Sequence, residues 1–200
     1  MKIIAITPEL SHPDEINFII KMLDAGFDYV HIRKPGFSMQ QMREYIKSIP
    51  PKYYDRLKIH NHFELAHEFN LAGIHLNMHC NVIPPNCENL SRSRSCHSEN
   101  ELTDLNQYEY VFLSPIFDSI SKNGYKSKFS YGNLLEIFKH DGMKDKIIAL
   151  GGIMPFHLKQ LHNIGFAGAA FLGYLFNSSD IESLNKKIEL IKSSNAAIHY

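Results

Sequence analysis

The chain repeats one pattern along most of its length: a short apolar run, then a longer amphipathic stretch. Short runs rich in β-branched and aromatic residues are typical of buried strands, whereas apolar residues spaced three and four apart are typical of helices. Regular alternation of the two predicts a parallel sheet with right-handed crossovers. We expect strands at 3–7, 28–32, 57–60, 73–76, 93–97, 110–114, 147–150 and 167–172.

Helices are expected between these runs, at 14–23, 38–49, 62–69, 99–105, 131–138, 155–164 and 181–191. Segment 77–89 contains Pro84 and Pro85 and has no helical spacing, so it predicts a loop or one short turn. Eight strand–helix units of about 25 residues fit a compact α/β chain folded as a (β/α)₈ TIM barrel. We expect one domain over residues 1–200; a doubly wound open sheet is the alternative fold.

Composition narrows the classes of partner. Lys plus Arg total 21 and Asp plus Glu total 21, so the chain carries no net charge that would attract nucleic acid or an anionic membrane. No apolar run reaches the ~18 residues of a membrane span. Three cysteines (Cys80, Cys87 and Cys96) indicate free thiols and a cytoplasmic protein. The oligomeric state is left open, and a homo-oligomer is compatible with the sequence.

Functional groups of such barrels gather where strands end and the next loops begin. The expected seventh strand ends in Gly151 and Gly152, and the eighth ends in Leu172 and Gly173. Backbone N–H groups at these positions can approach a ligand closely, which predicts a phosphate cradle. In the alternative interpretation, the glycines serve only tight turns and close packing.

Other strand ends carry polar side chains. His31 and Arg33 share one face of the second strand, and Asn61 follows the third. An inward arginine needs an anionic partner, either a ligand or an internal carboxylate. His97 ends the fifth strand and is a candidate for proton transfer, while Ser98 and Glu101 fit a capping box.

The loop after the sixth strand offers hydroxyls and one cation, and resembles a lid that closes over an anion. Its candidate residues are Ser119, Ser121 and Lys122. Histidines and cysteines recur between 75 and 97, which would suit a zinc site, but their spacing fits no zinc motif. We therefore expect no metal ligands among them.

Taken in order, these motifs resemble the family shared by thiamin phosphate synthase and the thiazole tautomerase TenI. The resemblance covers nearly the whole chain. Its motifs are His31-Ile32-Arg33, Ile59-His60-Asn61, Gly73-Ile74-His75-Leu76, Ser95-Cys96-His97-Ser98, Ser114-Pro115-Ile116-Phe117, Ser119-x-Ser121-Lys122 and Ala149-Leu150-Gly151-Gly152-Ile153.

The resemblance implies a small barrel that binds a thiazole phosphate. Backbone groups at Gly152, Leu172 and Gly173 would hold the phosphate. Arg33 would meet an anionic group of the substrate, and the 119–122 loop would lie near the thiazole and the diphosphate.

The sequence departs from the synthase pattern at the expected Mg²⁺ ligands. Asn61-His62 stands where the family has Asn-Asp, and the stretch 77–80 lacks an acidic residue. Mg²⁺ prefers hard oxygen ligands, so these changes disfavour its binding. The strand-two lysine is also shifted by one position, to Lys34.

The sequence therefore favours a thiazole tautomerase that uses His97 and needs no cofactor. The alternative is a thiamin phosphate synthase that recruits Mg²⁺ through another carboxylate, such as Asp118 or Glu64. A third hypothesis is a non-catalytic binder of thiazole or thiamin phosphates.

Overall fold

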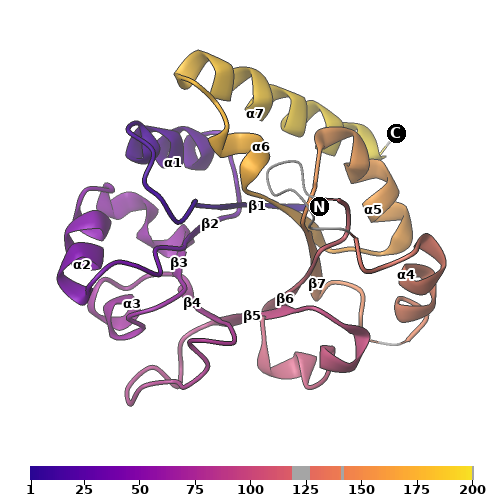
Figure 1. Cartoon of the computed structure of the whole chain (residues 1–200), viewed down its shortest axis with the longest axis horizontal. Helices are drawn as coiled ribbons and strands as arrows, with labels where there is room; N and C mark the ends of the chain where they lie inside the picture. Colours follow the sequence, from indigo (N-terminus) through magenta and orange to yellow (C-terminus); the bar gives the residue numbers. More distant parts are fainter. Residues whose placement is uncertain (119–126, 141, 200) are drawn as a thin grey trace.

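The computed structural model describes residues 1–118, 127–140 and 142–199. Within these ranges eight parallel strands form a closed barrel (Figure 1). The strands are β1 (Lys2–Ile6), β2 (Tyr29–Ile32), β3 (Leu57–Ile59), β4 (Gly73–Leu76), β5 (Arg92–Cys96), β6 (Tyr110–Leu113), β7 (Ile147–Leu150) and β8 (Gly168–Phe171). Closure is direct, because Ile4 of β1 lies opposite both Tyr29 and Ala170. The (β/α)₈ prediction is confirmed and the open sheet is excluded.

The helices surround the ring of strands (Figure 1). They are α1 (Glu15–Asp24), α2 (Met39–Lys47), α3 (Glu64–Glu68), α4 (Tyr131–Ile137), α5 (Leu158–Ile164), α6 (Gly173–Phe176) and α7 (Ile181–Ala196). Short 3₁₀ turns add η1 (Pro51–Arg56), η2 (Glu99–Glu101), η3 (Leu105–Gln107), η4 (Pro155–His157) and η5 (Ala197–His199). None of the helices in the described ranges is long and apolar enough to cross a membrane.

Local signals explain most helix boundaries. Ser38 and Gln41 form a capping box at the start of α2, whose residues Met42 and Ile46 are buried against the barrel. Each such apolar side chain stabilises the fold by about 1.5–3 kcal/mol on burial. Hydrophobic spacing and a polar cap therefore agree, as foldable sequences require.

The helix expected at 99–105 is wrong. The chain forms the two turns η2 and η3 instead, because Asp104 adopts a left-handed backbone conformation (φ 52°) that a continuous helix excludes. Ser98 also makes no side-chain bond to the helix backbone, so the expected capping box is absent. The loop predicted at 77–89 is confirmed, since no helix or strand forms in that described segment.

The barrel interior has two unlike halves. Apolar side chains from β1, β6, β7 and β8 form one cluster, which includes Ile4, Phe112 and Ile148. The strands β2 to β5 instead point buried polar groups inward, among them His31, Lys58, His75 and Ser93. Barrel interiors are normally filled by bulky apolar residues, so a polar half needs internal hydrogen bonds.

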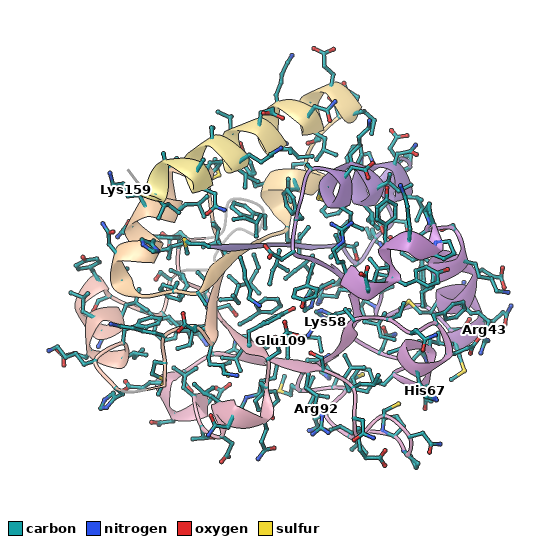
Figure 2. All side chains as sticks on the ribbon, turned by 180° about the vertical axis from the view of Figure 1, so that it is seen from behind. Arg43, Lys58, His67, Arg92, Glu109 and Lys159 are labelled. Carbon is teal, nitrogen blue, oxygen red and sulfur yellow. The ribbon has the colours of Figure 1, made fainter. Side chains whose placement is uncertain are left out.

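Charged groups close the end of the barrel away from the strand C-termini (Figure 2). The Lys58 ammonium is buried and lies 2.8 Å from a Glu109 carboxylate oxygen. Glu109 also accepts hydrogen bonds from Ser91 (2.5 Å) and Tyr29 (2.7 Å). These donors hold the pKa of Glu109 at about 2, while burial lowers the pKa of Lys58 despite the pairing. We call Lys58, Glu109, Ser91 and Tyr29 the basal cluster.

Candidate functional site

A cavity of about 1100 Å³ opens at the carboxyl ends of the strands. Its floor is apolar, with Ile6 and Phe112 from inside the barrel. Loops after several strands contribute its polar wall, as expected for a barrel of this type. The predicted site residues that line it are Arg33, Asn61, His97, Gly151, Gly152, Leu172 and Gly173.

The paired glycines after β7 are required by the backbone. Gly151 and Gly152 have φ of 96° and 64°, backbone angles that residues other than glycine rarely adopt. A Cβ on Gly152 would lie 2.3 Å from the carbonyl oxygen of Asp118. The glycines therefore allow the loop after β6 to pack against the loop after β7, which supports the packing interpretation as well.

The turns after β7 and β8 leave backbone donors at the cavity. The backbone N–H groups of Gly152 and Gly173 donate no hydrogen bond to any residue that the structure describes. Gly173 is the first residue of α6, where N–H groups are free in any helix. Both glycines line the one cavity that holds His97, so an anion bound there would face the imidazole.

His97 is anchored through one ring nitrogen. Its Nδ1 lies 3.2 Å from the carbonyl oxygen of Ser114, and its backbone N–H donates to Glu101. The Ser114 hydroxyl lies at the same 3.2 Å from Nδ1 and can donate or accept, so these contacts fit either tautomer of the neutral ring. In the tautomer whose Nδ1 donates to the carbonyl oxygen, Nε2 carries the lone pair. A base with this tautomer can take a proton from a ligand in the cavity.

Arg33 reaches the cavity with a carboxylate beside it. Its guanidinium lies 2.7 Å from Glu9, which belongs to the loop after β1, and both side chains are more than one-third exposed. The ion-pair alternative is therefore realised, although the partner comes from a loop. An exposed pair of this kind contributes little to stability, so the guanidinium is available to an anionic ligand.

The shift of the strand-two lysine by one position, to Lys34, places its ammonium outside the cavity. Lys34 does not line the cavity; it is buried, and it donates to Glu15 at 2.9 Å and to the Pro8 carbonyl at 2.7 Å. Successive strand residues point to opposite faces, so the shift moves the ammonium out of the site. Lys34 stabilises the packing of α1, and Tyr45 hydrogen-bonds the same carboxylate.

Asn61 has an unpaired acceptor. Its amide nitrogen donates to the Lys34 carbonyl (3.1 Å), while its buried Oδ1 has no partner among the described residues. Its neighbour His62 turns away, adopts φ 53° and bonds the Phe37 carbonyl through Nε2 at 2.7 Å. A buried polar atom without a partner is costly, so Asn61 is suited to accept a donor from a ligand.

His31 is buried below the cavity and does not line it. Its Nε2 lies 2.6 Å from the Tyr110 hydroxyl and its Nδ1 lies 2.9 Å from His60 Nε2. Direct substrate binding by His31, which the sequence predicts, has no support in this placement. His75 completes the group, with Ser93 and Ser95 each 2.9 Å from its ring nitrogens.

Burial keeps these three imidazoles neutral. Desolvation lowers the pKa of His60 to about 3 and lowers the pKa of His31 and of His75 well below the usual value. Neutral rings suit the interior, because each can donate and accept one hydrogen bond. We call His31, His60 and His75 the histidine triad.

The cavity does not fit Mg²⁺. Among the described residues that line it, Glu101 is the one carboxylate, and its oxygens accept bonds from the His97 N–H (3.0 Å) and the Ser98 hydroxyl (2.8 Å). The replacement ligands expected from the sequence, Asp118 and Glu64, are exposed and do not line the cavity. Mg²⁺ needs hard oxygen ligands that this wall does not supply.

The predicted loop residues Ser119, Ser121 and Lys122 lie outside the described residues. The sequence did not indicate Arg94 and Tyr108, which also line the cavity. The Arg94 guanidinium stacks on the Tyr108 ring, with its central carbon 4.6 Å from the ring centre. Arg94 lies between Ser93 and Ser95, so strand alternation points it outward, and no sequence signal indicated that the cavity extends over that edge.

Fold and site together define a closed (β/α)₈ barrel with a large cavity at the carboxyl ends of its strands. Residues 3–175 match the model of the family described as thiamine monophosphate synthase. The chain belongs to this family.

Relatives agree in name and in fold. A thiamine-phosphate synthase of Limosilactobacillus reuteri is 22% identical over 194 residues, covering 89% of each chain. The crystal structure of a thiamine phosphate pyrophosphorylase from Bacteroides thetaiotaomicron is 32% identical, covers 100% of both chains and superposes with a TM-score of 0.88. A Pyrococcus furiosus thiamine phosphate pyrophosphorylase shares the fold at 16% identity and a TM-score of 0.80, covering 98% of this chain and 96% of its own.

Proposed function

We propose that this protein is a thiamine-phosphate synthase, which joins a pyrimidine methyl diphosphate to a thiazole phosphate. In this reaction the carbon–oxygen bond to the diphosphate breaks and a carbon–nitrogen bond to the thiazole forms, while diphosphate leaves with the bonding electrons. The sequence pattern favours the tautomerase, but the Limosilactobacillus reuteri and Bacteroides thetaiotaomicron relatives are named as a thiamine-phosphate synthase and a thiamine phosphate pyrophosphorylase, and these names support this alternative.

The observation that carries the proposal is the size of the cavity and the spread of its anion-binding groups. About 1100 Å³ is slightly above the ~300–1,000 Å³ typical for one drug-sized ligand. Backbone donors at Gly152 and Gly173 suit the thiazole phosphate, and Arg33 suits the diphosphate. A site for two anionic substrates fits this arrangement better than a site for one.

Chemistry in such a site depends on position and charge. A departing diphosphate takes negative charge with it, and the Arg33 guanidinium stabilises that charge. The Asn61 Oδ1 accepts an N–H of the bound substrate and orients it. The apolar floor at Phe112 excludes water, which would otherwise capture the cation-like carbon.

Diphosphate release tests the proposal. Purified protein is mixed with both substrates, with and without Mg²⁺, and diphosphate and coupled product are measured together. We expect stoichiometric formation of both. Binding of thiazole phosphate with neither product contradicts the synthase. It supports a non-catalytic binder only if the tautomerase assay below also shows no turnover.

The tautomerase is a second candidate, and the position of the His97 imidazole in the cavity favours it, because proton transfer needs one acid–base group and no metal. Its test is the ultraviolet absorbance of the thiazole carboxylate phosphate during conversion. A tautomerase should lose about 10²–10⁴-fold in rate with His97→Gln. The synthase reaction removes no proton from carbon at this base, so the same variant should retain most diphosphate release.

A further inference from the structure

The histidine triad combines three ligand-type side chains from adjacent strands. His31 is on β2, His60 follows β3 and His75 is on β4. One ring nitrogen from each residue can be chosen so that all three atoms lie within 4.8 Å of one another. Nitrogen ligands 2.0–2.1 Å from one ion lie about 3.3 Å apart, so small side-chain rotations would bring these atoms to coordination distance.

We propose that His31, His60 and His75 form a binding site for a divalent transition-metal ion of the zinc class, beneath the cavity floor. Imidazole nitrogen suits Zn²⁺, Co²⁺, Ni²⁺ and Cu²⁺, and does not suit Mg²⁺. Three neutral histidines that leave one position open are also a ligand set of catalytic zinc sites. The proposal is independent of which reaction the cavity performs.

Hydrogen bonds around the triad hold the rings as metal ligands require. The Tyr110 hydroxyl is 2.6 Å from the outer nitrogen of His31, and the Ser93 hydroxyl is 2.9 Å from one nitrogen of His75. Ligating histidines usually bond a second group through the nitrogen that does not bind the metal. The ion would replace the bond between His31 and His60, and also one of the two serine contacts of His75, because Ser93 and Ser95 each lie 2.9 Å from one of its ring nitrogens. Whichever ring carries the proton shared by His31 and His60 would change tautomer without releasing it.

The histidine triad can be reached by a metal ion from the cavity, and the positive charges beside the triad are paired with carboxylates. His60 lines the cavity and the residue is 8% exposed, so a cation can reach the triad from the cavity mouth. The neighbouring cations are both paired: Lys58 with Glu109 at 2.8 Å and Arg33 with Glu9 at 2.7 Å. The open coordination position would face the cavity, where a ligand or water could occupy it.

The test uses tag-free, metal-free protein titrated with Co²⁺ and then Zn²⁺. We expect one Co²⁺ per chain, a visible absorption band of four-coordinate Co²⁺ that Zn²⁺ abolishes, and no competition by Mg²⁺. His75→Gln should weaken Co²⁺ binding at least a hundredfold. The matched control is His79→Gln, because His79 is exposed at the cavity rim and lies outside the triad.

A second measurement covers the case in which the buried variant does not fold. X-ray absorption at the zinc edge of the unmodified protein should show three imidazole ligands. Absence of binding, fewer than three imidazoles, or loss of binding in His79→Gln but not in His75→Gln would overturn the proposal. Circular dichroism of each variant separates lost binding from lost folding.

Discussion

At the scale of single residues, the placement of charge decides what each cation does. Arg33 and Lys34 are neighbours in sequence, yet Arg33 lies at the cavity and Lys34 is buried outside the barrel against Glu15. Strand alternation separates them. The loose pair with Glu9 leaves Arg33 available for a substrate, whereas the buried pair commits Lys34 to the fold.

We expect Arg33→Gln to raise the KM for the diphosphate substrate about ten- to hundredfold, because a charge-assisted hydrogen bond contributes about 1.5–3 kcal/mol. Folding stability should hardly change, since the pair is exposed. Steady-state kinetics and urea unfolding measure the two effects. Arg43→Gln is the control: its guanidinium pairs with Glu68 on the outer surface, far from the cavity (Figure 2). An unchanged KM in Arg33→Gln would contradict the role.

At the scale of elements, loops and strands constrain one another through close backbone contact. The loop after β7 fits under the loop after β6 because Gly152 has no side chain. Sequence patterns predicted the eight strands and the loop at 77–89, because periodicity and prolines are local signals. They could not predict the pairing of Lys58 with Glu109, which depends on the register of strands far apart in sequence.

Gly152→Ala should destabilise the fold by about 1–3 kcal/mol, because it combines an unfavourable φ with a clash against the Asp118 carbonyl. The displaced loop should also weaken phosphate binding. Urea unfolding and phosphate titration measure both effects. In α4, a Cβ on Gly132 would make an ordinary contact with Ser130 Oγ at 3.9 Å and the backbone is helical, so Gly132→Ala should stabilise by about 0.5–1 kcal/mol. Equal effects of the two substitutions would refute this account.

The basal cluster makes the free energy of unfolding depend on pH in the acid range, through the contact of Lys58 on β3 with Glu109 next to β6. The pKa of Glu109 is about 2 against an ordinary 4.5, so its contribution is complete above pH 4.5 and is lost as pH falls toward 2. Glu109→Gln should cost about 3–5 kcal/mol at neutral pH, because Lys58 stays buried without a carboxylate, and should flatten the acid dependence. Unfolding at several pH values measures this. The exposed pair partner Glu136 supplies the control Glu136→Gln, which should change neither quantity.

At the scale of the whole molecule, ring closure ties the chain into one cooperative body. β1 pairs with β8 as well as β2, so neither the first nor the last unit can separate without opening the barrel. The arrangement of the cavity depends on the same closure, because its walls come from both halves of the ring.

Residues 1–200 should therefore unfold in a single transition, with equal calorimetric and van't Hoff enthalpies. Thiazole phosphate at a hundred times its Kd should stabilise the protein by about 2.7 kcal/mol and shift the whole transition, rather than split it. Differential scanning calorimetry with and without ligand measures this. Two transitions, or a ligand shift of only part of the heat, would indicate independent units.

The basal cluster has one more consequence. Lys58 and Glu109 lie at the end of the barrel away from the strand C-termini. Neither is among the described residues that line the cavity. In the described part of the chain, the cavity is therefore closed at this end and opens at the carboxyl ends of the strands. Reactants and products would share this opening, so the molecule that binds deepest has to enter first and leave last.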